Sequence, residues 1–171
     1  MPRMVMVDYK ACTGCRICEM VCSLKNEGAI APSLSRIRVY AYPPGLDIPT
    51  VCVQCIKAAC AEVCPQKAIT RNNELDILTV DRELCTGCGI CVKACPSEAI
   101  KVHPEKGTAF KCELCNGEAP CVEACPADAL SVYSVPFDTR VFAKPSEKVA
   151  DELKESLLAI PEGKGRTRLK C

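Results

Sequence analysis

Residues 85–96 read CTGCGICVKACP and hold four of the chain's 17 cysteines, Cys85, Cys88, Cys91 and Cys95. Gaps of two, two and three residues separate them, and Pro96 follows the last one. Twelve further cysteines form three groups of similar spacing: Cys12, Cys15, Cys18, Cys22; Cys52, Cys55, Cys60, Cys64; and Cys112, Cys115, Cys121, Cys125. The groups beginning at Cys52 and Cys112 widen one gap to four and five residues, and a proline follows every group except the first. The chain therefore repeats one cysteine motif four times.

The group at residues 85–96 resembles the bacterial ferredoxin run, in which three cysteines bind one iron–sulfur cube and the fourth binds a neighbouring cube. Four such runs predict four [4Fe–4S] clusters held by the sixteen grouped cysteines. A protein that carries several clusters and little else is typical of one-electron transfer. The chemistry is thus predicted to belong to the clusters, with the cysteines as their ligands.

Zinc and disulfides are the two alternatives for so many cysteines. Structural zinc sites usually take two ligand pairs separated by a dozen or more residues, whereas here three cysteines fall within seven residues in the first and third groups. The Cys-Pro endings have no explanation in a zinc site. Disulfides belong to exported proteins, and the start MPRMVMVDYKACTG does not resemble a signal peptide. Iron–sulfur clusters are therefore the favoured interpretation.

The composition agrees with a metal-supported scaffold of 171 residues. Tryptophan is absent, aromatic residues make up 4%, and 13 prolines and 9 glycines accompany the cysteines. Such a chain builds only a modest apolar core. The formal charge is +1, but sixteen thiolates on four clusters would bring it to about −7, which argues against a nucleic-acid surface. No run of 18 apolar residues occurs, so we expect a cytoplasmic protein that does not span a membrane.

An internal repeat predicts the local structure around each cysteine group. Residues 7–15 (VDYKACTGC) are echoed by residues 80–88 (VDRELCTGC). Each unit is expected to contain a strand, a ligand loop, about one turn of helix with the last two cysteines, a proline stop and another strand. In the first group Ser23 replaces that proline, which relaxes the turn and removes no ligand. The predicted strands are Met4–Val7, Ile37–Tyr40, Ile77–Val80, Ala99–Val102, Ala109–Lys111 and Ala129–Val132.

Residues 135–171 follow the last group without a ligand pattern. A helix is expected to start at Pro145–Ser146, because Val149, Leu153, Leu157 and Ile160 recur at helical spacing until Pro161. This helix either packs on its own domain or docks a partner subunit or a second copy of the chain. His103, the only histidine, is expected at the surface, and Cys171 is expected to be a free thiol.

The four groups together, with their CTGC and Cys-Pro signatures, resemble the four-cluster iron–sulfur subunits of complex oxidoreductases such as dimethyl sulfoxide reductase, formate dehydrogenase and hydrogenase-linked systems. The resemblance covers about residues 4–134. It implies an α+β fold of two pseudo-symmetric ferredoxin-like halves with two [4Fe–4S] clusters each, to which the helical spacing after residue 145 adds a C-terminal helical tail. Residues 1–134 would form the cluster domain, with groups 12–22 and 112–125 in one half and 52–64 and 85–95 in the other. Residues 135–171 would be an extension.

In that family the halves exchange ligands, so the resemblance also implies four ligand sets. Site I would comprise Cys12, Cys15, Cys18 and Cys125. Site II would comprise Cys112, Cys115, Cys121 and Cys22. Site III would comprise Cys52, Cys55, Cys60 and Cys95, and site IV Cys85, Cys88, Cys91 and Cys64. The fourth cysteine of each group would thus cross to another group's cluster.

The short chain with the opening MVDYKACTGCRICEMVCSL is most similar to the small subunits beside tungsten-dependent aldehyde oxidoreductases. The resemblance implies a relay of single electrons between a tungsten- or molybdenum-pterin catalytic subunit and a further flavin or ferredoxin carrier. A free-standing soluble polyferredoxin, or a hydrogenase- or formate dehydrogenase-linked subunit, is the alternative. No catalytic residue set emerges, so we do not predict catalysis by this chain alone.

Overall fold

The computed structural model describes residues 3–43 and 45–158, which form a small α+β protein. These residues contain five α-helices and four two-stranded antiparallel sheets. The strands are β1 Arg3–Val7, β2 Ile37–Tyr42, β3 Leu46–Val51, β4 Ile69–Asn72, β5 Ile77–Val80, β6 Lys101–Val102, β7 Ala109–Phe110 and β8 Leu130–Ser134. The α-helices are α1 Ile17–Glu27, α2 Ala59–Glu62, α3 Ile90–Ala94, α4 Pro120–Glu123 and α5 Ser146–Leu158.

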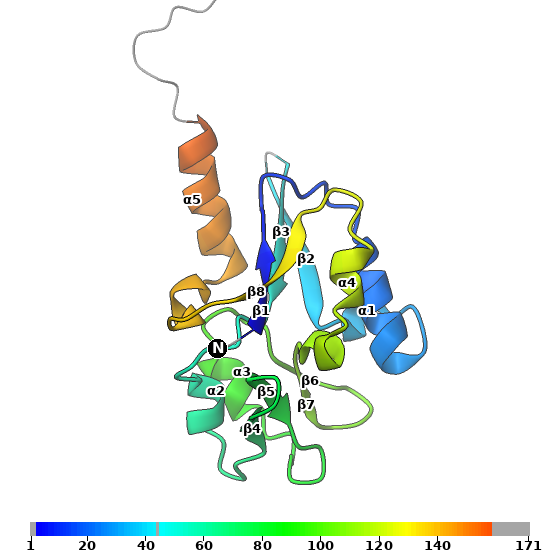
Figure 1. Cartoon of the computed structure of the whole chain (residues 1–171), viewed down its shortest axis with the longest axis vertical. Coiled ribbons are helices and arrows are strands. Elements are labelled where there is room, and N and C mark those ends of the chain that lie inside the picture. Colours follow the sequence, from blue (N-terminus) through cyan, green and yellow to red (C-terminus); the bar gives the residue numbers. More distant parts are fainter. Residues whose placement is uncertain (1–2, 44, 159–171) are drawn as a thin grey trace, which may run out of the picture.

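The sheets pair segments from the two ends of the chain as well as neighbours. Strand β1 pairs with β8, so Val5 faces Val132 although the two residues lie in the first and last strands. The other three sheets join consecutive strands, β2 with β3, β4 with β5 and β6 with β7. Figure 1 shows β1, β2, β3 and β8 with α1 and α4 in one part of the molecule and β4–β7 with α2 and α3 in the other. The β1–β8 pair therefore brings the first and fourth cysteine groups into the same part.

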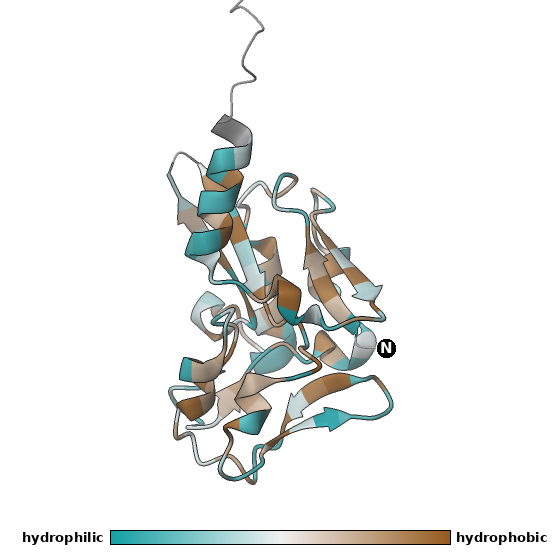
Figure 2. Cartoon of the chain, turned by 90° about the vertical axis from the view of Figure 1, so that its left-hand side faces the viewer, coloured by the Kyte–Doolittle hydropathy of each residue, from teal (hydrophilic) through white to brown (hydrophobic). Residues whose placement is uncertain are grey.

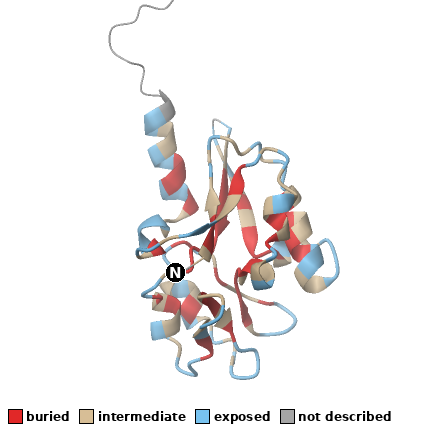
Figure 3. Ribbon diagram, in the orientation of Figure 1, coloured by how far each residue is buried: buried red, intermediate tan, exposed pale blue. Residues whose placement is uncertain are grey.

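The hydrophobic core is built largely from cysteines and short aliphatic strands. One buried cluster joins Val5, Ile37 and Val51 to cysteines of the first, second and fourth groups. Another joins Ile69, Leu78 and cysteines of the second and third groups. Figure 3 shows the buried residues concentrated on the strands and on the inner sides of the short helices. Because the cysteines occupy core positions, any group that binds to them also helps to pack the core.

Helix α1 is longer than the single turn that the repeat predicts. It carries Cys18 and Cys22 and continues to Glu27, where Gly28 closes it in the left-handed conformation, with φ of 73°. Ser23 explains the difference, since a proline there would remove a helical hydrogen bond and clash with the preceding turn. The Ser23 hydroxyl is buried, donates to the carbonyl of Met20 at 2.9 Å and accepts the N–H of Ala31 at 3.0 Å.

Each of the six predicted strand segments overlaps a strand of the structure. Strand β4 follows Pro65, where the repeat predicts a strand without stated bounds, whereas β3 was not predicted. Residues 42–45 read YPPG, which is typical of a turn or loop, and no strand was predicted directly after them. The structure instead folds residues 37–51 into a hairpin, with Pro49 opposite Val39. Pro49 is tolerated in a sheet of only two strands because the outer side of β3 has no further strand to bond.

Helix α5 begins at Ser146, as the sequence predicts, and packs on its own domain. Val149 and Ala150 are buried against Ile48 of β3, with Leu153 at the edge of the contact. The hydroxyls of Tyr42 and Ser146 lie 2.8 Å apart and tie the start of the helix to β2. Figure 2 shows mainly hydrophilic residues on the coloured turns of α5. The predicted helical positions Ile160 and Pro161, and the predicted free thiol Cys171, lie outside the described residues.

The prediction that His103 lies at the surface is wrong, because its side chain is 2% exposed. Its Nδ1 accepts the backbone N–H groups of Glu105 and Lys106, at 3.2 and 3.1 Å, and its ring packs edge-on against Phe110. Nε2 lies 3.4 Å from a carboxylate oxygen of Glu27. A turn that folds back on the histidine thus buries it, which its position beside Pro104 does not reveal.

Candidate functional site

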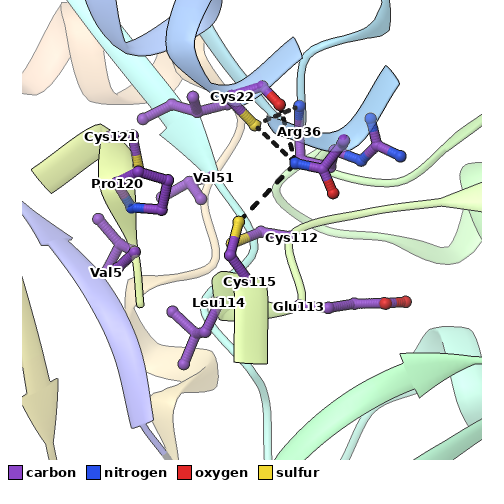
Figure 4. A pocket seen from close by; sticks show the side chains of 13 residues that line it. Val5, Cys22, Arg36, Val51, Cys112, Glu113, Leu114, Cys115, Pro120 and Cys121 are labelled. Carbon is purple, nitrogen blue, oxygen red and sulfur yellow. Dashed lines mark hydrogen bonds between the residues drawn. The ribbon is translucent and has the colours of Figure 1, made fainter. Parts of the chain in front are cut away.

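The sixteen grouped cysteines are free thiols, and twelve of them line three recesses, each of which draws on two groups of the sequence. Site II is a recess of about 380 Å³, partly open to solvent. It is lined by Cys22 from α1 and by Cys112, Cys115 and Cys121 from the fourth group. Figure 4 shows these four cysteines around the recess, together with apolar side chains that include Val5 and Val51.

Sites I and IV are similar recesses at other places in the fold. Site I, of about 340 Å³, is lined by Cys12, Cys15, Cys18 and Cys125. Site IV, of about 350 Å³, is lined by Cys64, Cys85, Cys88 and Cys91. Of the sixteen cysteines, the two that are exposed, Cys15 and Cys88, belong to these two sites.

The cysteines of site III act on one another electrostatically. Burial and the charges of Cys52 and Cys95 raise the pKa of Cys55 to about 11. Burial and the same two neighbours raise the pKa of Cys60 to about 12, while the ammonium of Lys111 acts in the opposite direction. Cys55, Cys60 and Cys95 also belong to one buried cluster, so Cys95 of the third group lies close to the second group. The ligand set of site III stays a prediction.

Backbone geometry explains how the loops approach each recess. Gly87, with φ of 67°, lies so close to Gly107 that an added Cβ would sit 1.9 Å from the Gly107 carbonyl oxygen. Glycine is required there both by the left-handed conformation and by the missing space. Short helices then place the third cysteine of the later groups, namely Cys60, Cys91 and Cys121.

Backbone N–H groups point at three of the cysteine sulfur atoms. The N–H of Arg36 donates to Sγ of Cys22 at 3.3 Å, that of Ala68 to Cys64 at 3.3 Å, and that of Ala109 to Cys85 at 3.2 Å. Such donors stabilise negative charge on sulfur. The thiol positions are thus prepared to carry thiolates.

Without metal, however, the buried cysteines resist ionisation. Burial raises the pKa of Cys18 and of Cys121 to about 12, and neighbouring charges add to it in each case. A cationic iron–sulfur core would reverse that balance, because it binds thiolates and releases their protons. Apolar recesses with four thiols and inward N–H donors therefore fit an iron–sulfur cluster. Among the described residues, no three His, Cys, Asp or Glu side chains are placed to hold a single metal ion.

Several polar residues next to the sites were missed by the sequence analysis. The Nδ2 of Asn26 lies 3.8 Å from the sulfur atoms of both Cys22 and Cys115. The Asp138 carboxylate accepts the N–H of Ile56, beside Cys55, at 3.3 Å. Asn26 lies one helical turn after Cys22, a signal that the spacing offered, whereas Asp138 is remote in sequence and only the fold brings it near.

The description of the chain as an iron–sulfur protein is supported by a family comparison. Residues 46–134 match the model of the 4Fe-4S dicluster domain. The match spans the second, third and fourth cysteine groups and more than half of the chain. The chain therefore belongs to the 4Fe-4S dicluster domain family.

Curated relatives share about a third of their aligned residues with the chain. The polyferredoxin-like subunit of aliphatic sulfonate oxidoreductase from Pyrococcus furiosus is 39% identical over 109 residues, which cover 64% of this chain and 63% of the relative. The matching tetrathionate reductase subunit from Archaeoglobus fulgidus is 34% identical over 108 residues, covering 63% and 52%. Electron transport protein HydN from Escherichia coli is 37% identical over 109 residues, covering 60% and 61%. The chain thus spans less than two thirds of the length of each.

Among solved structures, a chain of the active site complex BamBC of benzoyl coenzyme A reductase, in complex with benzoyl-CoA, aligns with a TM-score of 0.48 and 24% identity. The alignment covers 92% of this chain and 94% of that one.

Proposed function

We propose that this chain is the electron-transfer subunit of an oxidoreductase complex and holds one [4Fe–4S] cluster in each of sites I–IV. Each cluster, when bound, accepts and releases one electron. The sixteen cysteines Cys12, Cys15, Cys18, Cys22, Cys52, Cys55, Cys60, Cys64, Cys85, Cys88, Cys91, Cys95, Cys112, Cys115, Cys121 and Cys125 are the proposed ligands. The chain's own contribution is to bind the clusters, fix their spacing and surround them with apolar groups and N–H donors.

The observation that carries this proposal is that cysteines of different groups lie together in shared buried clusters. Cys18 of site I acts electrostatically on Cys121 of site II. Cys52 of site III does the same to Cys112 of site II. Cysteines of sites III and IV share one buried cluster. The exposed Cys15 and Cys88 lie in sites I and IV, so the two ends of the proposed series are accessible to redox partners.

The arrangement also supports two ferredoxin-like halves. Sites I and II draw on the first and fourth groups, which β1 and β8 bring together, and sites III and IV draw on the second and third. We propose residues 1–134 as the cluster domain and residues 135–171 as an extension that docks a partner or a second copy. The exposed side chains of Phe137 (48%) and Val141 (63%) support a docking role.

The proposed partner is a large catalytic subunit with a tungsten or molybdenum pterin, such as an aldehyde oxidoreductase, with a flavin or ferredoxin carrier at the other end. Two of the relatives are subunits of oxidoreductases by name, which supports a catalytic partner. In residues 3–43 and 45–158, no helix has the length and apolar character to cross a membrane. A cytoplasmic location stays a prediction.

Iron and sulfide analysis of the anaerobically purified protein tests the cluster proposal, with about sixteen irons per chain expected. Electron paramagnetic resonance of the reduced protein should then detect four clusters. Far fewer irons, or zinc in their place, would contradict the proposal.

Co-purification tests the role in a complex. A tagged chain expressed in its native host should bring down a large subunit, and metal analysis of the complex should detect tungsten or molybdenum. A fully loaded monomer that transfers electrons without any partner subunit would instead favour a free-standing polyferredoxin. A partner with nickel and iron would favour a hydrogenase-linked subunit.

A further inference from the structure

Lys111 is a buried cation at the boundary between sites II and III. It follows β7, immediately precedes Cys112 of site II, and is 2% exposed. Its Nζ donates to the carbonyl of Cys112 at 3.0 Å and to the carbonyl of Leu78. These two contacts hold the ammonium group inside the protein, away from water.

Gln54 connects the same point to site III. It lies between Cys52 and Cys55 in the sequence and is completely buried. Its Nε2 donates to the Cys112 carbonyl at 2.7 Å, so that this one oxygen accepts bonds from both Gln54 and Lys111. Its Oε1 accepts the N–H of Leu78 at 2.8 Å. The ammonium group is therefore fixed where the ligand loops of the two sites meet.

Lys111 forms no ion pair with an Asp or Glu side chain among the described residues. Burying a charge without an opposite charge is costly, and two carbonyl dipoles offset only part of that cost. The nearby groups that would become anionic when clusters bind are the cysteines of sites II and III. The ammonium opposes the effect of burial on the pKa of Cys112 in site II and of Cys60 in site III.

We propose that Lys111 is the shared counter-charge of the clusters in sites II and III and raises their reduction potentials. This inference rests on the proposed function, since it requires clusters in both sites. A cluster becomes more negative when it accepts an electron, so a fixed positive charge stabilises the reduced form more than the oxidised form. The exposed cysteines of sites I and IV place the outer clusters nearer to water, which screens charge. Lys111 is thus a positioning residue that stabilises the reduced clusters of sites II and III, in the middle of the series.

The test is a potentiometric titration with dithionite, followed by electron paramagnetic resonance, on the loaded full-length protein. Lys111→Gln keeps a donor for the carbonyls but removes the charge. It should lower two of the four midpoint potentials. At a given applied potential, the ratio of reduced to oxidised cluster should fall at least tenfold in those two sites, which corresponds to a shift of about 59 mV for one electron. Lys111→Arg should keep potentials close to the original ones. Lys148→Gln, which removes an exposed charge from α5, is the matched control and should shift none of them.

Unchanged potentials in Lys111→Gln, or an equal shift of all four, would overturn the inference. If Lys111→Gln does not bind clusters but Lys111→Arg does, the requirement for charge is upheld; failure of both variants would assign Lys111 to packing and overturn it. Iron analysis of the unaltered protein separates the two proposals. A chain without clusters refutes the proposed function, whereas a loaded chain that is insensitive to Lys111 refutes only this inference.

Discussion

Replacing Cys125 together with Cys12 should remove one cluster, whereas replacing Cys125 together with Cys112 should remove two. Cys12 and Cys125 line site I, although they belong to the first and last cysteine groups, while Cys112 lines site II. With four irons per site, the unaltered chain should hold about sixteen irons, Cys12→Ala/Cys125→Ala about twelve and Cys112→Ala/Cys125→Ala about eight. Iron and acid-labile sulfide per chain, with spin counts of the reduced protein, measure the difference.

A chain in which each consecutive group held its own cluster would give the opposite order. Cys112→Ala/Cys125→Ala would then keep about twelve irons and Cys12→Ala/Cys125→Ala about eight, and that result would refute ligand exchange. Cys171→Ala is the control and should keep the full complement, because Cys171 lies outside the four groups. The same comparison between sites III and IV, with Cys95 paired to Cys52 or to Cys85, repeats the test independently.

Three further comparisons test the supporting structure. Gly87→Ala should lower the stability of the loaded protein more than Gly89→Ala does. Both glycines have positive φ, which costs an alanine about 1–2 kcal/mol, but only at Gly87 does the added Cβ meet backbone atoms, which adds about 1–3 kcal/mol. The thermal loss of cluster absorbance measures the stability of the two variants. Ser23→Pro should lower the free energy of unfolding by about 3 kcal/mol because it breaks α1, whereas Ser23→Ala should lower it by about 1 kcal/mol. Equal effects of the two variants in urea titrations would contradict the role of Ser23 in extending the helix. Burial acts to raise the pKa of Glu27, but its bonds to Lys106 and Arg36 outweigh burial and lower that pKa to about 2. Glu27→Gln should therefore lower the free energy of unfolding by about 3 kcal/mol at pH 7. Since the folded-state pKa of Glu27 is depressed, the difference in stability between the variant and the unaltered protein should stay constant down to about pH 4.5 and shrink only as the pH falls towards 2. A difference that already changes between pH 8 and 6 in urea titrations would point to another group.

The ion pair between Glu27 and Arg36 shows why parts of the fold escaped prediction. Its carboxylate lies 2.6 Å from the guanidinium of Arg36, and both side chains are less than 10% exposed. The same carboxylate faces His103, and the Arg36 guanidinium lies 5.1 Å from the ring centre of Phe110. These residues come from four separate segments, so no local pattern marked any of them as buried. Strand β3 escaped for a different reason, because proline is typical of loops and only the pairing with β2 makes Pro49 part of a strand.

The sequence alone determined the chemistry: four cysteine groups with ferredoxin-type spacing predict iron–sulfur clusters, because ligand type and local spacing decide which cofactor a loop can surround. It also predicted most of the short strands and the start of α5, which depend on local hydrophobic patterns. The tertiary structure decided which cysteines face one another, since only the pairing of β1 with β8 brings the first group beside the fourth. It also decided where charge is buried, as at Lys111 and Glu27, because burial depends on what the rest of the chain packs around a residue.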